Sequence, residues 1–205
     1  MQNKSTLPIL IFLLLILLSG ASNYIYASDD DTTKKSFDPR IEIKLNSILL
    51  IGIINPAIEF KVHKKGTVQL EVLGIFYPKG FLGRNNPPLT LVGSWLDFRY
   101  YLTKAFDGIY IGANGGFASY RMCKNKIYWE QRKIQVGAAM MFGATFGYKL
   151  NLSDRWVVDF YWSPGWQNSV YEGYNVDTGE RYVGINESGE WLLAYKGGIS
   201  IAFRL

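Results

Sequence analysis

The chain has 205 residues, a formal net charge of +5 and 48% hydrophobic residues. This length fits one domain, and the single cysteine, Cys123, excludes an internal disulfide. One histidine and no cluster of metal ligands at useful spacing argue against a metal centre. The Lys and Arg residues are scattered rather than grouped in a stripe, so we expect no nucleic-acid partner. Nothing in the sequence indicates a cofactor.

The first segment, "MQNKSTLPILIFLLLILLSGASNYIYASDD", predicts a secretory signal peptide. A lysine precedes an apolar run from Leu7 to Leu18, and small residues follow the run. We expect cleavage after Ala21, or as late as Ala27. The run is shorter than the ~20 apolar residues of a spanning helix. We therefore assign 1–21 to the signal peptide, 28–40 to a flexible periplasmic leader and 41–205 to one folded domain.

After residue 40 the hydrophobic pattern has a period of two, which is typical of strands. Each predicted strand has one face of bulky apolar residues and one face of small residues with isolated charges. In the last strand, Trp191, Tyr195 and Phe203 are assigned to the bulky face. The eight segments are "RIEIKLNSILLIG", "AIEFKV", "TVQLEVLGIFY", "SWLDFRYYL", "IYIGANGGFASY", "IQVGAAMMFGATFGYKL", "WVVDFYWSPGW" and "WLLAYKGGISIAFRL".

The links between these segments differ in length in a regular way. Links at 63–66, 103–108 and 151–155 are short, whereas those at 78–92, 121–133 and about 166–189 are long and polar. The first link, at 52–56, is brief. Short links at one end and mostly long ones at the other indicate an outer-membrane barrel with periplasmic turns and surface loops.

A soluble up-and-down barrel is the competing interpretation, because it also has strands with two unlike faces. It would place the bulky residues inside, whereas an eight-stranded barrel has an interior just wide enough for small residues and a few charges. We therefore predict an all-β, eight-stranded antiparallel up-and-down transmembrane barrel in the outer membrane of a Gram-negative bacterium. Expected partners are outer-membrane lipids, lipopolysaccharide and, through the terminal strand, the outer-membrane assembly machinery.

Aromatic residues near the predicted strand ends fit this interpretation, since amphipathic rings favour the headgroup level of a membrane. The set comprises Trp95, Tyr100, Tyr101, Trp156, Trp162, Trp166, Trp191 and Tyr195.

Residues 41–205 resemble an uncharacterised family of small outer-membrane barrels, a domain of unknown function. The segments that carry the resemblance are "DFRYYLTKAFDGIYIG", with Arg99, Tyr100, Phe106, Gly108 and Gly112, and the closing "YKGGISIAFRL". The resemblance implies fold and location but no catalytic residues. The architecture is also similar in pattern to the transmembrane domain of OmpA-type proteins.

The charged residues of the small face are expected inside the barrel, where they would have to be paired. A gated ion path or a proton-sensing network is the alternative interpretation. The predicted set of internal charges comprises Glu71, Asp97, Arg99, Lys149, Asp159, Lys196 and Arg204.

No catalytic residues are predicted. His63 lies in "HKKG", a predicted periplasmic turn with no adjacent serine. Cys123 lies in a predicted surface loop and is interpreted as an unpaired thiol, with an intermolecular disulfide as the alternative. The last loop, "SVYEGYNVDTGERYVGINESGE", has a composition suited to recognition, although a solvated loop would look the same. "NVDTGE" lacks the ligand pattern of a calcium loop.

These observations predict a non-enzymatic outer-membrane protein with a structural or surface-interaction role through its loops. The alternatives are a lipid-modifying enzyme and a narrow channel. The residues that would bind a surface ligand cannot be named from the sequence.

Overall fold

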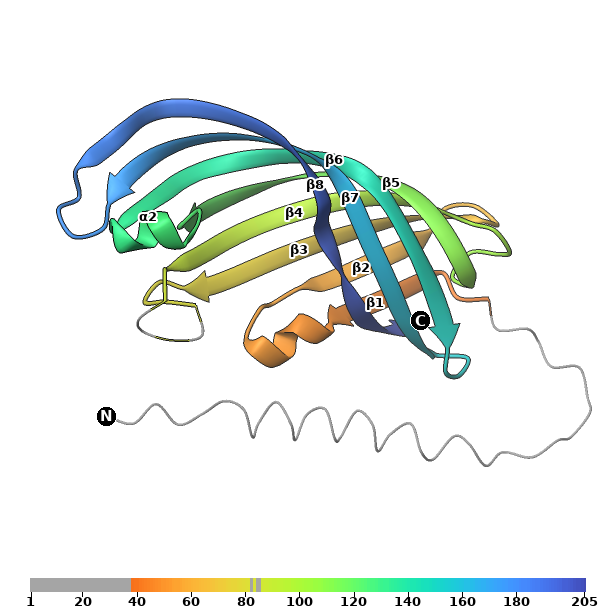
Figure 1. Cartoon of the computed structure of the whole chain (residues 1–205). Coiled ribbons are helices and arrows are strands. Elements are labelled where there is room, and N and C mark those ends of the chain that lie inside the picture. The colour runs from red at the N-terminus through yellow and green to blue at the C-terminus, as the bar shows by residue number, and fades with distance from the viewer. Residues whose placement is uncertain (1–37, 82, 84–85) are drawn as a thin grey trace, which may run out of the picture. The chain divides into compact units, whose positions relative to one another are not determined.

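A computed structural model describes residues 38–81, 83 and 86–205. The predicted signal peptide and most of the predicted leader lie outside the described residues. Eight strands follow one another along the chain, with one 3-10 helix and one short α-helix between them (Figure 1). The elements are β1 (Ile41–Asn46), η1 (Ser47–Ile51), β2 (Pro56–Lys61), β3 (Gly66–Tyr77), β4 (Leu89–Tyr101), β5 (Gly108–Met122), α2 (Lys126–Glu130), β6 (Lys133–Asn151), β7 (Trp156–Asn175) and β8 (Arg181–Arg204).

Each strand pairs antiparallel with the next, and β1 pairs with β8 to close the sheet into a barrel. Glu42 lies opposite Arg204 and Asn46 opposite Ser200 in the closing pair. Closure removes the exposed edges that an open sheet would present. The prediction of an all-β, eight-stranded antiparallel up-and-down barrel is confirmed.

The two faces of each strand separate as the period-two pattern predicts. In β6, Met140 and Phe142 are 59% and 57% exposed on the outer face, whereas Thr145 and Lys149 are buried inside. Successive side chains point to opposite faces of a strand. The bulky apolar residues therefore cover the outside of the barrel, and the charged and small residues fill the inside.

The strands differ greatly in length. β1 and β2 have six residues each, whereas β7 has 20 and β8 has 24. In Figure 1, β6, β7 and β8 extend well past the ends of β1 and β2. The short turns lie at the opposite end from the β7–β8 turn. No helix among the described residues is long and apolar enough to cross a membrane.

The prediction of a long loop at about 166–189 is wrong. β7 continues to Asn175 and β8 begins at Arg181, so only residues 176–180 form the turn. Pairs such as Trp166 with Trp191 and Tyr171 with Asn186 extend the hairpin. The Gly and acidic residues of this segment suggested a loop, but the ladder between two adjacent strands outweighs their weak strand propensity.

The first predicted strand is also too long at its C-terminal end. Asn46 ends it, because the Asn46 side chain accepts a hydrogen bond of 3.1 Å from the Ile48 N–H and caps η1. Gly52 then ends η1 with a left-handed φ of 78°. The segment after η1 returns to β3 through Ile54, whose N–H donates to the Gly74 carbonyl at 2.9 Å.

Three aromatic residues predicted for the outside lie inside the barrel instead. Tyr101 is fully buried, and Trp95 is 3% exposed with its ring over Gly93 and Gly116. Both lie on the same side of β4 as Asp97. The alternation of side chains along β4 therefore predicts the position of these rings better than their place near the strand ends does. Tyr195, the third, packs against the same internal cluster as Trp95.

Pro164 explains the position of Tyr195. Proline has no backbone N–H and cannot take its place in a ladder. Ser163 pairs with Lys196 and Gly165 with Leu192, so residues 193–195 of β8 bulge opposite Pro164. A bulge disrupts the ladder locally and bends the strand. This bulge adds two residues to β8, so Trp191 stays outside and Lys196 inside, and only within the bulge does the alternation fail. The Tyr195 ring consequently lies inside, against Gly143 and Gly165.

Candidate functional site

The inside of the barrel holds a charge network of ten buried side chains. Five are acidic and five are basic, so their formal charges cancel. They come from seven of the eight strands: Glu42, Lys44, Glu59, Glu71, Asp97, Arg99, Lys149, Asp159, Lys196 and Arg204.

Arg99 lies at the centre of the charge network. Its guanidinium reaches Asp159 at 2.9 Å, Asp97 at 3.2 Å and Glu59 at 3.3 Å. The Arg99 guanidinium also lies 4.7 Å from the centre of the Tyr110 ring. A planar guanidinium with five donors suits a position where several carboxylates converge.

Two lysines complete the central layer. The Lys149 ammonium lies 2.9 Å from Glu59 and also pairs with Glu42. The Lys44 ammonium lies 2.7 Å from Asp159 and also pairs with Glu59. Glu59 therefore contacts Lys44, Lys149 and Arg99 at once.

The charge network continues toward both ends of the barrel. Toward the short turns, Arg204 contacts Glu42 at 2.9 Å and the Asn151 side-chain oxygen at 2.7 Å. Toward the long hairpin, Lys196 contacts Glu71 at 2.9 Å and Asp97 at 3.4 Å. A continuous path of ion pairs thus runs from Lys196 to Arg204.

Tyrosine hydroxyls donate further hydrogen bonds to two carboxylates of the charge network. Tyr101 donates to Glu59 at 2.6 Å, and Tyr110 donates to Asp159 at 2.7 Å. The Asn46 amide donates to the Tyr161 hydroxyl at 2.7 Å. Burying charge is costly unless each charge is paired and hydrogen-bonded, and these contacts meet that requirement.

All seven internal charges predicted from the sequence are buried in the charge network. The prediction missed Glu42, Lys44 and Glu59, together with the tyrosines that bind them. The alternation of β1 and β2 places these three charges on the small face, and this signal was available.

An apolar layer lies next to the charge network on the side of the long hairpin. Trp95, Ala118, Ala139 and Met141 form a buried cluster against which Leu73, Leu91, Tyr120 and Tyr195 pack. Tight packing of this kind leaves little room for water. The apolar layer and the charge network thus lie next to each other inside the barrel.

The β7–β8 hairpin beyond Trp166 and Trp191 forms an extended surface, which we call the distal hairpin (residues 167–190). Its turn is held against the loop that contains α2 by Arg132, whose guanidinium contacts Asp177 at 3.0 Å. The hydrogen bond from Arg132 holds the pKa of Asp177 below its usual value of 3.8. Tyr128 of α2 and Tyr182 of β8 add a ring contact with centroids 6.5 Å apart.

His63 and Cys123 each take part in a local hydrogen bond. His63 is exposed in the turn between β2 and β3, where its Nδ1 accepts a hydrogen bond of 3.4 Å from the Lys65 N–H. The Cys123 thiol donates to the Asn125 carbonyl at 3.1 Å, and burial raises the pKa of this thiol. No group of three His, Cys, Asp or Glu residues in the described part of the chain could hold a metal ion.

The fold and its interior define a closed eight-stranded β-barrel whose polar residues point inward. Residues 10–205 match a family described as Protein of unknown function (DUF3575), and the chain belongs to this family. No curated protein and no solved structure matches the chain.

Proposed function

We propose that this chain is an outer-membrane β-barrel protein without enzymatic activity, which acts at the cell surface through its distal hairpin. The observation that carries the proposal is the inverted polarity of the barrel. Charged residues are paired inside, while large apolar side chains such as Phe98, Phe142 and Trp162 are about half exposed outside. Such a surface is stable against lipid and unfavourable in water.

The aromatic pairs on the outer face agree with the thickness of a membrane. Trp156 stacks edge-on with Phe203 at 5.0 Å, and Trp166 with Trp191 at 5.7 Å. Trp166 lies ten positions after Trp156 along β7, and a tilted transmembrane strand has ~9–11 residues. The two pairs would then mark the two headgroup levels, with the distal hairpin beyond the outer one.

The contacts of the interior support a surface role over a channel. An ion could pass only by separating pairs such as Arg99 with Asp159 and Lys149 with Glu59, which lie at 2.9 Å. The interior of an eight-stranded barrel is only just wide enough for its side chains to fill. His63 is exposed beside Lys64 and Lys65 at the end of the barrel with the short turns. It is therefore no partner for general acid–base chemistry at the other end, which would face the cell surface.

The test combines three measurements on the full-length protein. A biotin maleimide should label a Thr178→Cys variant, in a Cys123→Ser background, on intact cells. The purified protein should give no conductance steps in planar bilayers, and His63→Ala should leave the lipid A of the host unchanged. Conductance steps that disappear when Arg99 is neutralised would establish a channel instead. A change in lipid A that is lost with His63→Ala would establish an enzyme.

The surface role itself is tested by shortening the distal hairpin. Removing residues 174–182 and joining the strands with a short turn leaves the charge network untouched. We expect normal levels of folded barrel and loss of any binding or adhesion phenotype of the full chain. A retained phenotype would contradict a role for the distal hairpin.

A further inference from the structure

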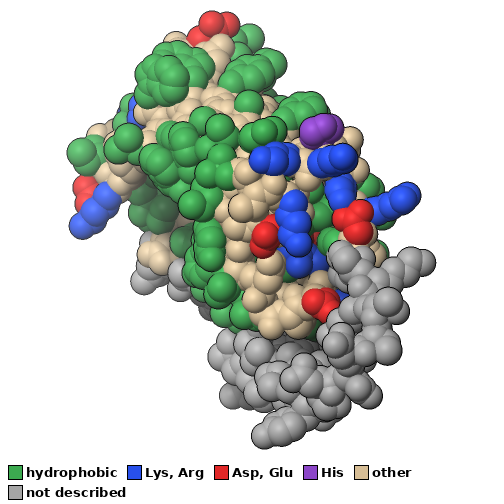
Figure 2. All heavy atoms as spheres, turned by 90° about the vertical axis from the view of Figure 1, so that its right-hand side faces the viewer, with side chains coloured by type: hydrophobic (Ala, Val, Ile, Leu, Met, Phe, Trp, Pro, Cys, Tyr) green, Lys and Arg blue, Asp and Glu red, His purple; other side chains and the backbone are tan. Residues whose placement is uncertain are grey.

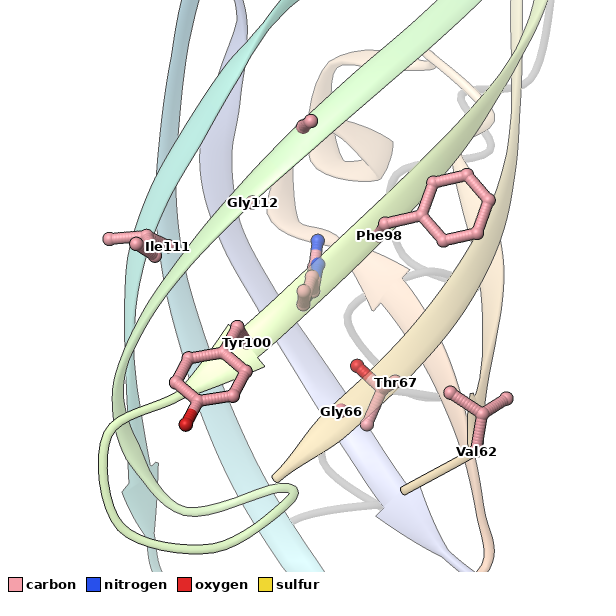
Figure 3. Close-up of a pocket in the computed structure, with 9 residues that line it drawn as sticks. Val62, Gly66, Thr67, Phe98, Tyr100, Ile111 and Gly112 are labelled. Atoms are coloured by element: carbon pink, nitrogen blue, oxygen red, sulfur yellow. The ribbon is translucent and has the colours of Figure 1, made fainter. Parts of the chain in front are cut away.

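A groove of about 410 Å³ lies on the outer face of the barrel, at the end with the short turns. Its apolar walls come from β4, β5 and Val62, which directly follows β2. Figure 3 shows Phe98 and Val62 on one side, Tyr100 and Ile111 on the other, and Gly66 between them. The volume lies within the range of about 300–1,000 Å³ that is common for small-molecule sites.

Small residues beside large ones create this groove. Gly66 pairs with Tyr100, and Ala113 pairs with Phe98 on the other side of β4. Neighbouring side chains on one face of a sheet stand close together. A residue with little or no side chain therefore leaves a slot beside each ring. Phe98 is 56% and Tyr100 is 51% exposed, so the ring walls stand out from the sheet.

The groove opens at its lower end onto a basic turn, "VHKKG", which carries Lys64 and Lys65. The backbone of this turn is fixed, because the Lys64 carbonyl accepts from the Ala105 N–H at 2.9 Å and the Lys65 carbonyl accepts from the Tyr101 N–H at 2.8 Å. The contact with Ala105 brings the segment that contains Lys104 to the same turn. Lys64 and Lys104 are both exposed.

Positive charge gathers around this turn. Figure 2 shows the single histidine, His63, beside several Lys and Arg side chains at this end of the barrel. The nearby Asp107 carboxylate accepts a hydrogen bond of 2.6 Å from the Asn151 amide. Apolar walls next to a basic mouth match an amphiphile with an acyl chain and an anionic headgroup.

We propose that this groove is a binding site for one anionic glycerophospholipid, with an acyl chain between Phe98 and Tyr100 and the phosphate at Lys64 and Lys104. The inference rests on the proposed function, which puts the short turns at the periplasmic leaflet. It goes further by assigning a lipid class to defined residues. Lipid chains of any kind would contact the apolar outer face, but only an anionic headgroup gains from the two lysines.

The experiment is native mass spectrometry of the full chain in detergent micelles, titrated with phosphatidylglycerol or with phosphatidylcholine of the same acyl chains. We expect one phosphatidylglycerol to be retained in preference to phosphatidylcholine. Lys64→Gln with Lys104→Gln should weaken phosphatidylglycerol binding ~30-fold, from ~5-fold for each lysine, and should leave phosphatidylcholine unchanged. Ala113→Phe, which fills the groove, should weaken both lipids.

Lys126→Gln with Lys133→Gln, at the opposite end of the barrel, is the matched control and should not alter retention. Equal retention of the two lipids by the natural protein, or equal losses in the test and control variants, would overturn the site. So would retention of neither lipid. A gel that compares boiled and unboiled samples distinguishes a failure of the lipid site from a failure of the proposed function. An intact membrane barrel without lipid preference still changes its apparent mass on boiling, whereas a protein that is not a membrane barrel does not.

Discussion

At the scale of single residues, Glu59 is a carboxylate inside the barrel that three basic side chains share. It contacts Lys44, Lys149 and Arg99, and it accepts hydrogen bonds from Tyr101 and Thr67. Removing one partner of a buried pair leaves an uncompensated charge in a medium of low dielectric constant. The neutrality of the charge network thus depends on this carboxylate.

We predict that Glu59→Gln lowers the free energy of unfolding by ~3–5 kcal/mol. The measurement is urea unfolding of the refolded protein in lipid vesicles, followed by tryptophan fluorescence. Glu187→Gln, an exposed position on the distal hairpin, is the control. A second change, Lys149→Met, should recover part of the loss by restoring the charge balance. Equal unfolding midpoints for Glu59→Gln and Glu187→Gln would contradict a role for neutrality.

Gly143 illustrates the packing requirement of the inner wall. A Cβ atom at this position would meet the Pro164 carbonyl and the Tyr195 ring. Gly184 has no atom within 4 Å of the same position, so it is a matched control. We predict that Gly143→Ala lowers the free energy of unfolding by ~1–3 kcal/mol and that Gly184→Ala has little effect. Equal effects in the same urea assay would show that Tyr195 does not pack against this wall.

At the scale of elements, an exposed ion pair helps to hold the turn of the distal hairpin in position. Arg132 binds the Asp177 carboxylate at 3.0 Å, and the Arg132 carbonyl accepts a hydrogen bond of 2.8 Å from the Val176 N–H. A carboxyl whose pKa is lowered on folding adds stability above its unfolded pKa. That stability is lost as the pH falls through the lower folded value.

We predict that the hairpin turn keeps its order from pH 8 to pH 5 and becomes more mobile as the pH falls below 3.8, the usual pKa of Asp177, toward the lower pKa of the folded protein. A spin label at Thr178→Cys, in the Cys123→Ser background, reports the mobility by electron paramagnetic resonance. Asp177→Asn should be mobile across the whole range. Mobility that begins near neutral pH, or that is unchanged in Asp177→Asn, would assign the order of the turn to other contacts.

At the scale of the whole molecule, the period-two pattern was sufficient to predict eight antiparallel strands and their two faces. It was strongest where the strands are long and their faces differ in size, as in β6, where Phe142 and Lys149 point to opposite sides. It also placed all seven of the predicted charges inside. The strand order needed only the rule that consecutive strands pair, which this barrel follows throughout.

The remaining features depend on contacts between distant residues. Tyr195 turns inward because Pro164 on the neighbouring strand breaks the ladder, and the β8 sequence alone carries no sign of this bulge. The distal hairpin was mistaken for a loop because its Gly and acidic residues have weak strand propensity, while pairing across the hairpin decides the outcome. The lipid groove likewise depends on which residues of β3 and β5 lie beside Phe98 and Tyr100.

The central claim is that the apolar outer face is buried in the outer membrane. The most direct test separates inner and outer membranes and compares boiled with unboiled samples of the extracted protein on a gel. A folded species in the outer-membrane fraction that changes apparent mass on boiling is the result we predict. A water-soluble periplasmic protein with no shift on boiling would contradict the claim.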